Sequence, residues 1–85
     1  MNATIKTVEN LKEQGYVLFA FVTNDGIDYK NAFKSYNDAL VYLIDRAGLE
    51  DEKEFILSGE KSIHDFGDFF NLYDIDDCIK DLKNA

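Results

Sequence analysis

Proline is absent from this 85-residue sequence, and cysteine and histidine each occur once. Without proline, no helix or strand has to end at one. With a single cysteine, Cys78, the chain can form no internal disulfide, which is compatible with a reducing cytoplasm. One cysteine and one histidine, His64, also fall short of the ligand set of a structural zinc site. The composition therefore disfavours scaffolds held together by disulfides or zinc.

Long apolar runs are absent as well. The longest, Tyr16 to Val22, is far shorter than the roughly 20 residues of a membrane-spanning helix. Residues 1–15 lack the apolar core of a signal peptide. We therefore expect a cytoplasmic protein. A chain of this length is expected to form a single domain, 1–85, with no large internal substrate cavity.

Basic residues are scarce relative to acidic ones, 9 against 17, so the formal net charge is −8 at pH 7. Residues 1–44 hold five acids and four bases, whereas residues 45–85 hold twelve acids and five bases. Such a field disfavours direct binding of nucleic acid, which needs lysine and arginine against its phosphates, and it attracts basic proteins. The alternative is that the acidity only keeps a small domain soluble.

The first half of the chain is predicted to contain a helix and a β-hairpin. Residues 4–14 place apolar side chains at helical spacing, and Gly15 follows as a typical helix-ending residue. The run YVLFAFVT at 16–23 is rich in β-branched and aromatic residues, which predicts a strand buried on both faces or nearly so. The Asn-Asp-Gly sequence at 24–26 favours a tight turn. We therefore expect 27–34 to pair antiparallel with 16–23.

The clearest helix is predicted over residues 36–47. Ser35 can cap its first turn, Asp38 follows three residues later as in a variant capping box, and Gly48 ends it. After it, EFILSG at 54–59 is short and apolar enough for a third strand, with a helix through 50–57 as the alternative.

Two further helices are predicted near the C-terminus. Ser62 can cap a helix whose aromatic residues recur at helical spacing up to Tyr73, although Gly67 weakens it by about 1 kcal/mol relative to alanine, so a loop is the alternative. Asp74 can cap the last helix, which buries a stripe formed by Ile75, Cys78, Ile79 and Leu82.

This order, α-β-β-α-(β)-α-α, predicts an α+β domain in which helices pack against a small antiparallel sheet. Cys78 is expected to behave as a small buried apolar residue. The other expected core residues are Phe19, Phe21, Leu40, Leu43, Ile44 and Ile79.

Short motifs for catalysis or metal binding are incomplete. The sequence DID at 74–76 begins like a calcium loop, but cysteine and isoleucine occupy the later positions that need an oxygen ligand and a glycine. The sequence DFG at 65–67 matches the kinase magnesium motif without the glycine-rich loop or the strand lysine. No two carboxylates stand out as an acid–base pair. We therefore expect no enzyme, no cofactor and no metal.

The acidic residues of the second half are the candidate partner-binding surface. They lie on the outer faces of predicted helices and in short links, where a rigid surface could present them together. Carboxylates held in this way can imitate the phosphates of a duplex. The candidate residues are Glu50, Asp51, Glu52, Glu54, Asp65, Asp68, Asp74, Asp76, Asp77 and Asp81.

The run from Asn31 to Leu82 resembles one module of the ArdA antirestriction proteins, which are acidic DNA mimics of conjugative elements and phages. Three segments carry the resemblance: NAFKSYNDALVYLIDRAGL, EKEFILSGE and SIHDFGDFFNLYDIDDCIKDL. The family pattern implies an acidic strand at the second of them. The chain is also similar to small acidic phage anti-CRISPR proteins. Both resemblances imply a non-enzymatic inhibitor that blocks the basic groove of a nucleic-acid-handling enzyme.

Two other classes of function stay open. An immunity protein that neutralises a basic toxin nuclease would share the size and the acidity. A structural or regulatory interaction module of a larger complex would need no acidic surface. The expected partner of an acidic inhibitor is a basic protein, with no direct binding of nucleic acid or membrane, and a homodimer is compatible with the sequence.

Overall fold

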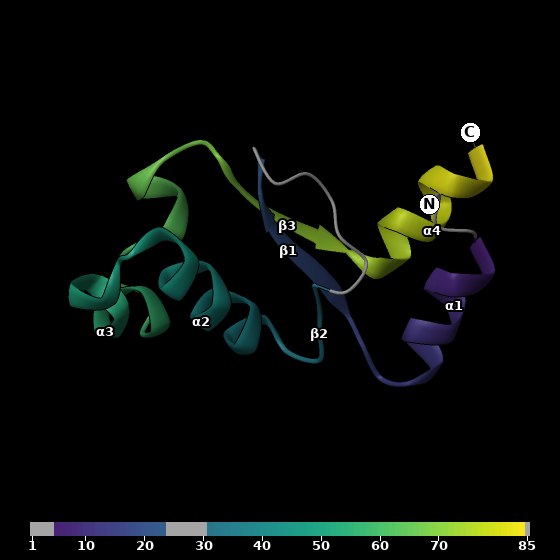
Figure 1. Cartoon of the computed structure of the whole chain (residues 1–85), viewed down its shortest axis with the longest axis horizontal. Coiled ribbons are helices and arrows are strands. Elements are labelled where there is room, and N and C mark those ends of the chain that lie inside the picture. The colour runs from purple at the N-terminus through teal and green to yellow at the C-terminus, as the bar shows by residue number, and fades with distance from the viewer. Residues whose placement is uncertain (1–4, 24–30, 85) are drawn as a thin grey trace.

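A computed structural model of the protein describes residues 5–23 and 31–84 (Figure 1). The predicted α+β class is confirmed. Helices α1 and α4 lie together at one end of the elongated molecule, α2 and α3 lie at the other end, and the sheet joins them (Figure 1). The elements in chain order are α1 (Ile5–Glu13), β1 (Leu18–Val22), β2 (Ala32–Phe33), α2 (Tyr36–Ala47), the 3₁₀ turn η2 (Glu50–Glu52), α3 (Lys53–Leu57), the 3₁₀ turn η3 (Ile63–Phe66), β3 (Phe70–Asp74) and α4 (Ile75–Asn84).

The sheet has the order β2-β1-β3, and both pairings are antiparallel. The central strand β1 pairs with β3 along its whole length, from Leu18 opposite Asp74 to Val22 opposite Phe70. Its pairing with the short strand β2 confirms the predicted hairpin over the residues described. The predicted turn at 24–26 and the start of the second hairpin strand lie outside the described residues.

The predicted third strand at 54–59 is wrong, and the helical alternative holds. Residues 50–57 form η2 and α3. Only one face of this short helix is buried: Ile56 is 3% exposed and packs in the core together with Leu40, Leu43 and Ile44 of α2, whereas Phe55 is 40% exposed. Three successive acids, Glu50 to Glu52, precede α3, where carboxylates are stabilised by the helix dipole.

The predicted helix over 62–73 is also wrong beyond its first turn. Ser62 caps η3 as expected, with Asp65 completing a capping box, but the chain leaves the helix at Gly67 and continues as β3. A Cβ atom on Gly67 would lie only 2.2 Å from the ring of Phe69, so this bend needs a glycine unless that ring moves. The segment from Phe70 onward therefore forms β3, which pairs with the edge of β1 opposite to β2.

Both ends of α2 and the start of α4 form as predicted. The Ser35 hydroxyl accepts a hydrogen bond from the Asp38 amide at 3.1 Å, and Gly48 ends α2 with a φ of 70°. At α4, the Asp74 carboxylate accepts a hydrogen bond from the Asp76 amide at 2.8 Å. Both helices thus begin at a side chain that satisfies an otherwise unpaired amide.

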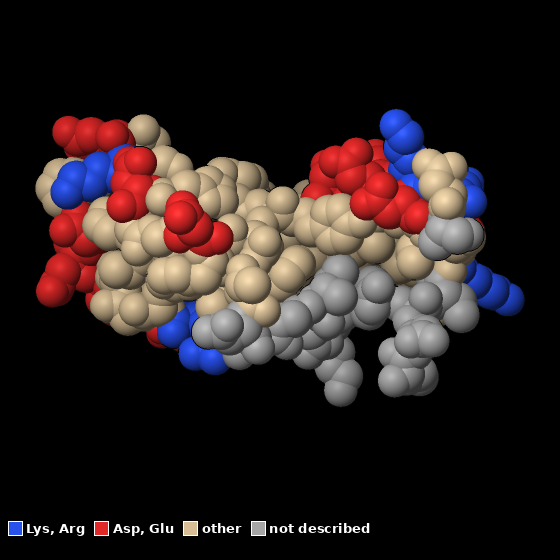
Figure 2. Space-filling model, turned by 90° about the horizontal axis from the view of Figure 1, so that it is seen from above, with Lys and Arg blue, Asp and Glu red and all other residues tan. Residues whose placement is uncertain are grey.

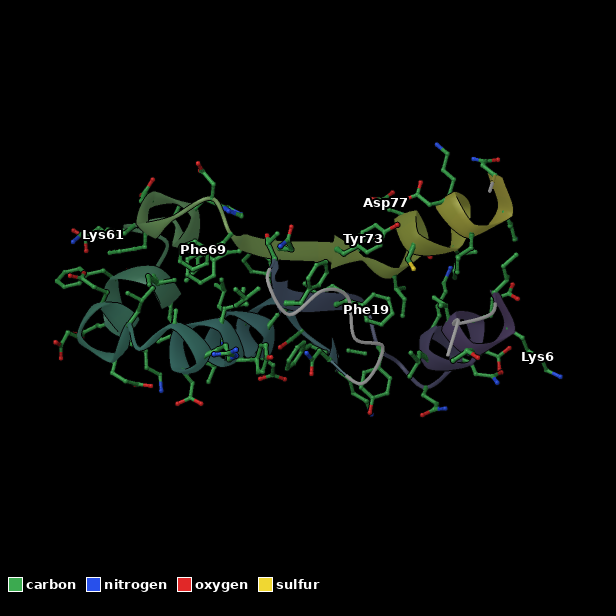
Figure 3. All side chains as sticks on the ribbon, turned by 45° about the horizontal axis from the view of Figure 1, so that its top comes forward. Lys6, Phe19, Lys61, Phe69, Tyr73 and Asp77 are labelled. Carbon is green, nitrogen blue, oxygen red and sulfur yellow. The ribbon has the colours of Figure 1, made fainter. Side chains whose placement is uncertain are left out.

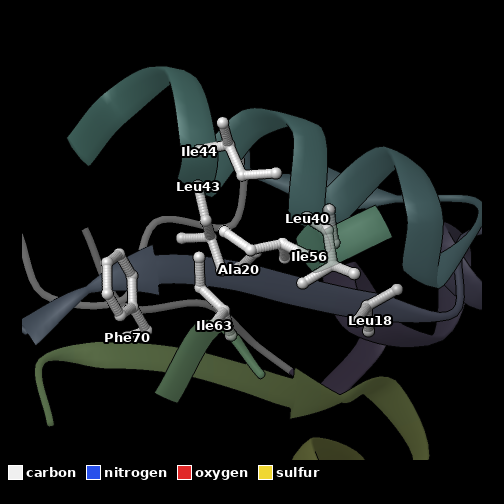
Figure 4. Packing of buried hydrophobic residues seen from close by; sticks show 9 residues of the cluster. Leu18, Ala20, Leu40, Leu43, Ile44, Ile56, Ile63 and Phe70 are labelled. Atoms are coloured by element: carbon white, nitrogen blue, oxygen red, sulfur yellow. The ribbon is translucent and has the colours of Figure 1, made fainter. Parts of the chain in front are cut away.

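The core consists of two clusters on opposite faces of β1. On one face, Leu18 and Ala20 pack against α2, α3 and η3 in what we call the α2 cluster (Figure 4). On the other face, Phe19 packs against α1 and α4 in the α4 cluster. The prediction that β1 is buried on both sides is confirmed. The α2 cluster consists of Leu18, Ala20, Ala39, Leu40, Leu43, Ile44, Ile56, Ile63 and Phe70, and the α4 cluster of Val8, Phe19, Ile75, Cys78 and Ile79.

Among the expected core residues, Phe21 is the exception, because it is only partly buried. It pairs with Asn71, whereas α4 leaves the sheet at the opposite end of β3, next to Leu18. The helix that covers Phe19 therefore does not extend over Phe21.

Within residues 5–23 and 31–84, no helix combines the length and the apolar character needed to cross a membrane.

Candidate functional site

The ten acidic residues predicted as a partner-binding surface separate along the chain into two groups, on either side of the first four residues of β3. We call the first the α3-end group, which precedes β3 in the chain, and the second the α4-end group, which begins at the last residue of β3. The face shown in Figure 2 carries acidic side chains over both ends of the long axis, with uncharged residues between them. The α3-end group consists of Glu50, Asp51, Glu52, Glu54, Asp65 and Asp68, and the α4-end group of Asp74, Asp76, Asp77 and Asp81.

Nearly all of these carboxylates are exposed to solvent, and only Glu52 is partly buried. Five of them hold local structure. Two are the capping residues Asp65 and Asp74. Glu52 accepts a hydrogen bond from Lys61 Nζ at 3.0 Å, and Asp76 lies 2.5 Å from Lys12 Nζ. The fifth, Asp81, accepts a hydrogen bond from the Tyr73 hydroxyl.

The other five acids have no such role within the described part of the chain. They make no side-chain hydrogen bond or ion pair there. A partner could therefore engage these carboxylates without first breaking an internal contact. They are Glu50, Asp51, Glu54, Asp68 and Asp77.

The α4-end group is held in place by the packing of α4. Buried Ile75, Cys78 and Ile79 face the α4 cluster, so the acids between them must point outward. The ion pair with Asp76 joins α4 to α1 and raises the pKa of Lys12, because the neighbouring carboxylate favours the charged ammonium. These acids are thus presented by a rigid helix and not by a loose tail.

Cys78 is buried as predicted, with 2% of its surface exposed. Burial raises the pKa of its thiol, which disfavours the reactive thiolate. Tyr73 (Figure 3) lies beside Cys78, and its hydroxyl donates a hydrogen bond to Asp81, which raises the pKa of Tyr73. The surroundings of Cys78 are therefore those of a packed core residue.

A pocket of about 230 Å³ lies between the start of α2 and the link from α3 to η3. Tyr36, Lys61 and Ser62 supply its polar groups, and Leu40 and Ile63 its apolar floor. Lys61 is already engaged by Glu52 and lies over the rings of Phe55 and Phe66.

In the described residues, no three His, Cys, Asp or Glu side chains gather as metal ligands would.

The outer edge of β3 is a feature that sequence reasoning missed. The helical spacing of the aromatic residues hid a strand pattern in which Phe70 and Leu72 pack in the α2 cluster, whereas Tyr73 packs against the α4 cluster on the other face of the sheet. Phe69, which is 42% exposed, stands at the start of this edge. The two acidic groups therefore flank a strand and not a helix.

Comparison of the chain with protein-family models, with curated proteins and with solved structures found no match. The resemblance to antirestriction and anti-CRISPR proteins therefore stays a prediction. One of its segments, EKEFILSGE, for which the family pattern implies a strand, is largely helical here.

Proposed function

We propose that this protein acts without catalysis, as an acidic inhibitor of the antirestriction or anti-CRISPR type. Its two acidic groups bind the basic groove of a nucleic-acid-handling protein and compete there with nucleic acid. The observation that carries the proposal is that one face of the molecule presents acidic side chains at both ends of its long axis (Figure 2).

The dimensions of the molecule suit such competition. Its longest extent is 38 Å, close to the roughly 34–36 Å of one helical turn of duplex DNA. Proteins that grip a duplex place arginine and lysine against phosphates along such a length. Carboxylates at both ends of this body can reach cationic side chains that are separated by about one turn.

The ordered elements that carry the carboxylates also support the proposal. The α4-end group is carried by a capped, packed helix, and α3 packs on α2 through Ile56. Side chains on ordered elements lose less conformational freedom on binding than those of a disordered tail. The negative field would also steer a basic partner toward this face, and salt would weaken that attraction.

Matched charge-reversal variants test the proposal. The first variant carries Glu50→Lys and Asp51→Lys, which reverse two exposed acids that make no side-chain hydrogen bond or ion pair in the described part of the chain. The control carries Glu9→Lys and Glu13→Lys, which change the net charge equally but lie on exposed positions of α1. Circular dichroism and urea unfolding should show that both variants fold.

Nucleic-acid-binding proteins of the host are first eluted from a DNA column and bound to a labelled duplex. The assay then measures how much of these proteins the acidic protein displaces from the duplex. The unmodified protein should displace a member of this fraction from the duplex. The displacement should fall as salt is raised through about 0.1 M, because salt at that concentration screens charges that are more than about 10 Å apart. The Glu50/Asp51 variant should be much weaker, and the Glu9/Glu13 control should be nearly unchanged. Absence of displacement by the unmodified protein, or equal displacement by both variants, would reject the proposal.

A further inference from the structure

We infer that the outer edge of β3 binds an extended segment of the basic partner, which joins the sheet as a fourth strand. The inference rests on the proposed function in one respect, namely that the partner is a basic protein. It adds a mode of recognition, main-chain pairing, which acidic side chains alone would not provide.

The register of β3 shows which of its backbone groups face outward. The Thr23 amide donates to the Phe69 carbonyl at 2.8 Å, and the Ile75 amide donates to the Val17 carbonyl at 2.9 Å. In an antiparallel pair, hydrogen-bonded residues alternate with residues whose backbone groups point away from the partner strand. Asn71 and Tyr73 therefore bond to β1, whereas the amide and carbonyl groups of Phe70 and Leu72 point outward.

These outward groups lie at an open edge of the described structure. β3 is the last strand of the sheet. Outside the regular ladders, no backbone hydrogen bond of the described residues uses Phe70 or Leu72. Figure 3 shows β3 running along the rim between η3 and α4, with no described ribbon beyond it.

The edge is held rigidly by its side chains. Phe70 is 3% exposed in the α2 cluster, and Leu72 packs against the same cluster. On the other face, Asn71 Nδ2 donates to the Thr23 hydroxyl at 2.7 Å, and Tyr73 bonds to Asp81. An incoming strand would therefore meet a template that is already ordered, which lowers the entropic cost of pairing.

The charges around the edge select a basic occupant. Exposed edge strands are commonly protected by lysine, but the sequence has no lysine or arginine between Lys61 and Lys80. Asp68 lies just before β3, and Asp74 ends it. The only described ion pair near this end joins Asp76 to Lys12. Cationic side chains at both ends of an incoming segment would meet carboxylates there.

A second copy of this chain fits the edge less well. It would bring its own net charge of −8 and place a second set of acids beside Asp68 and Asp74, and like charges on neighbouring strands are destabilising. A strand of five residues spans about 17 Å, so the segment that fits carries lysine or arginine at both ends of a short β-forming stretch. An arginine at the Phe69 end could also stack on that exposed ring.

The test uses a synthetic peptide of about nine residues, long enough to cover β3 and reach the flanking acids. It carries lysine and arginine at both ends and alternating threonine and valine between them. Amide exchange of the full-length protein is followed by NMR with and without this peptide. We expect exchange to slow at Phe70 and Leu72 and to change little at Asn71 and Tyr73, which already bond to β1.

Two sets of control peptides separate main-chain pairing from charge. In the first set, alternate amides are N-methylated, either at the odd or at the even positions, which removes donors without changing the charge. One pattern should weaken binding by about tenfold or more, since it removes several backbone hydrogen bonds, and the other should have little effect. In the second set, glutamate replaces the basic residues, and these peptides should not bind.

The outcomes distinguish this inference from the proposed function. A basic peptide that binds equally with either methylation pattern, without protecting Phe70 and Leu72, would overturn edge pairing and leave charge recognition intact. Protection of both amides that grows with protein concentration in the absence of peptide would identify a second copy as the occupant and overturn the inference. Failure of both the peptide and the DNA-displacement assay would reject the proposed function together with this inference.

Discussion

The Tyr73 hydroxyl donates a hydrogen bond to the Asp81 carboxylate, and this contact connects the end of β3 to the second turn of α4. The Tyr73 ring also lies 6.5 Å, centroid to centroid, from that of Phe19, its partner across the sheet. One tyrosine thus links the edge strand, the central strand and the helix that presents the α4-end group.

Replacing Tyr73 with phenylalanine should lower the free energy of unfolding by about 0.5–1.5 kcal/mol, the usual net value of one hydrogen bond. Because the pKa of Tyr73 is raised in the folded state, this contribution should be fully present below about pH 10, the ordinary tyrosine value. It should shrink above that pH, where the unfolded tyrosine ionises first.

Urea unfolding at about pH 8 and about pH 11 measures this difference between the unmodified protein and the variant. Tyr36→Phe is the matched control, since Tyr36 is 56% exposed. A difference for Tyr73→Phe that is the same at both pH values would show that the Asp81 contact does not control its ionisation.

The Leu43→Ala substitution should cost about 2–5 kcal/mol of unfolding free energy, because Leu43 is fully buried in the α2 cluster and its loss leaves a cavity. Val17→Ala removes apolar atoms from a side chain that is 44% exposed and should cost far less. Chemical unfolding monitored by circular dichroism provides both values. Equal costs would mean that the α2 cluster is not the main core.

Native Cys78 should react slowly with a thiol reagent, and its rate should rise when urea unfolds the protein. Burial both restricts access to the sulfur and raises the pKa of the thiol. The measurement is the rate of labelling by a chromogenic disulfide in native buffer and in urea. Rapid labelling of protein with native circular dichroism would contradict the placement of Cys78 in the α4 cluster.

Asp74→Ala should lower stability by about 1 kcal/mol, because it removes the cap of α4, whereas Asp74→Asn should cost little, since asparagine caps equally well. Thermal unfolding of both variants tests this. Millimolar calcium should leave the melting temperature of the unmodified protein unchanged, as expected of a capping role. A rise of several degrees with calcium, abolished by Asp74→Asn, would instead indicate that Asp74 is a metal ligand.

Sequence patterns were sufficient where the decisive interactions are local. Ser35, Asp38 and Gly48 determine both ends of α2 through contacts within a few residues. Asp74 and the apolar stripe of α4 are equally local, and the dense apolar run of β1 predicted a strand buried on both faces. The acidic charge and its concentration in the second half also follow from composition alone.

The tertiary structure decided the segments whose local pattern allows two conformations. The aromatic spacing from Phe66 to Tyr73 fits a helix, but residues 70–74 extend because β1 has a free side and pairing there buries Phe70. Burial of Ile56 against α2 likewise selects α3 at 53–57 over the strand that the sequence predicted at 54–59. The open edge of β3, with Asp68 just before it and Asp74 at its end, arises only from this non-local pairing, since the pairing places β3 at the rim of the sheet.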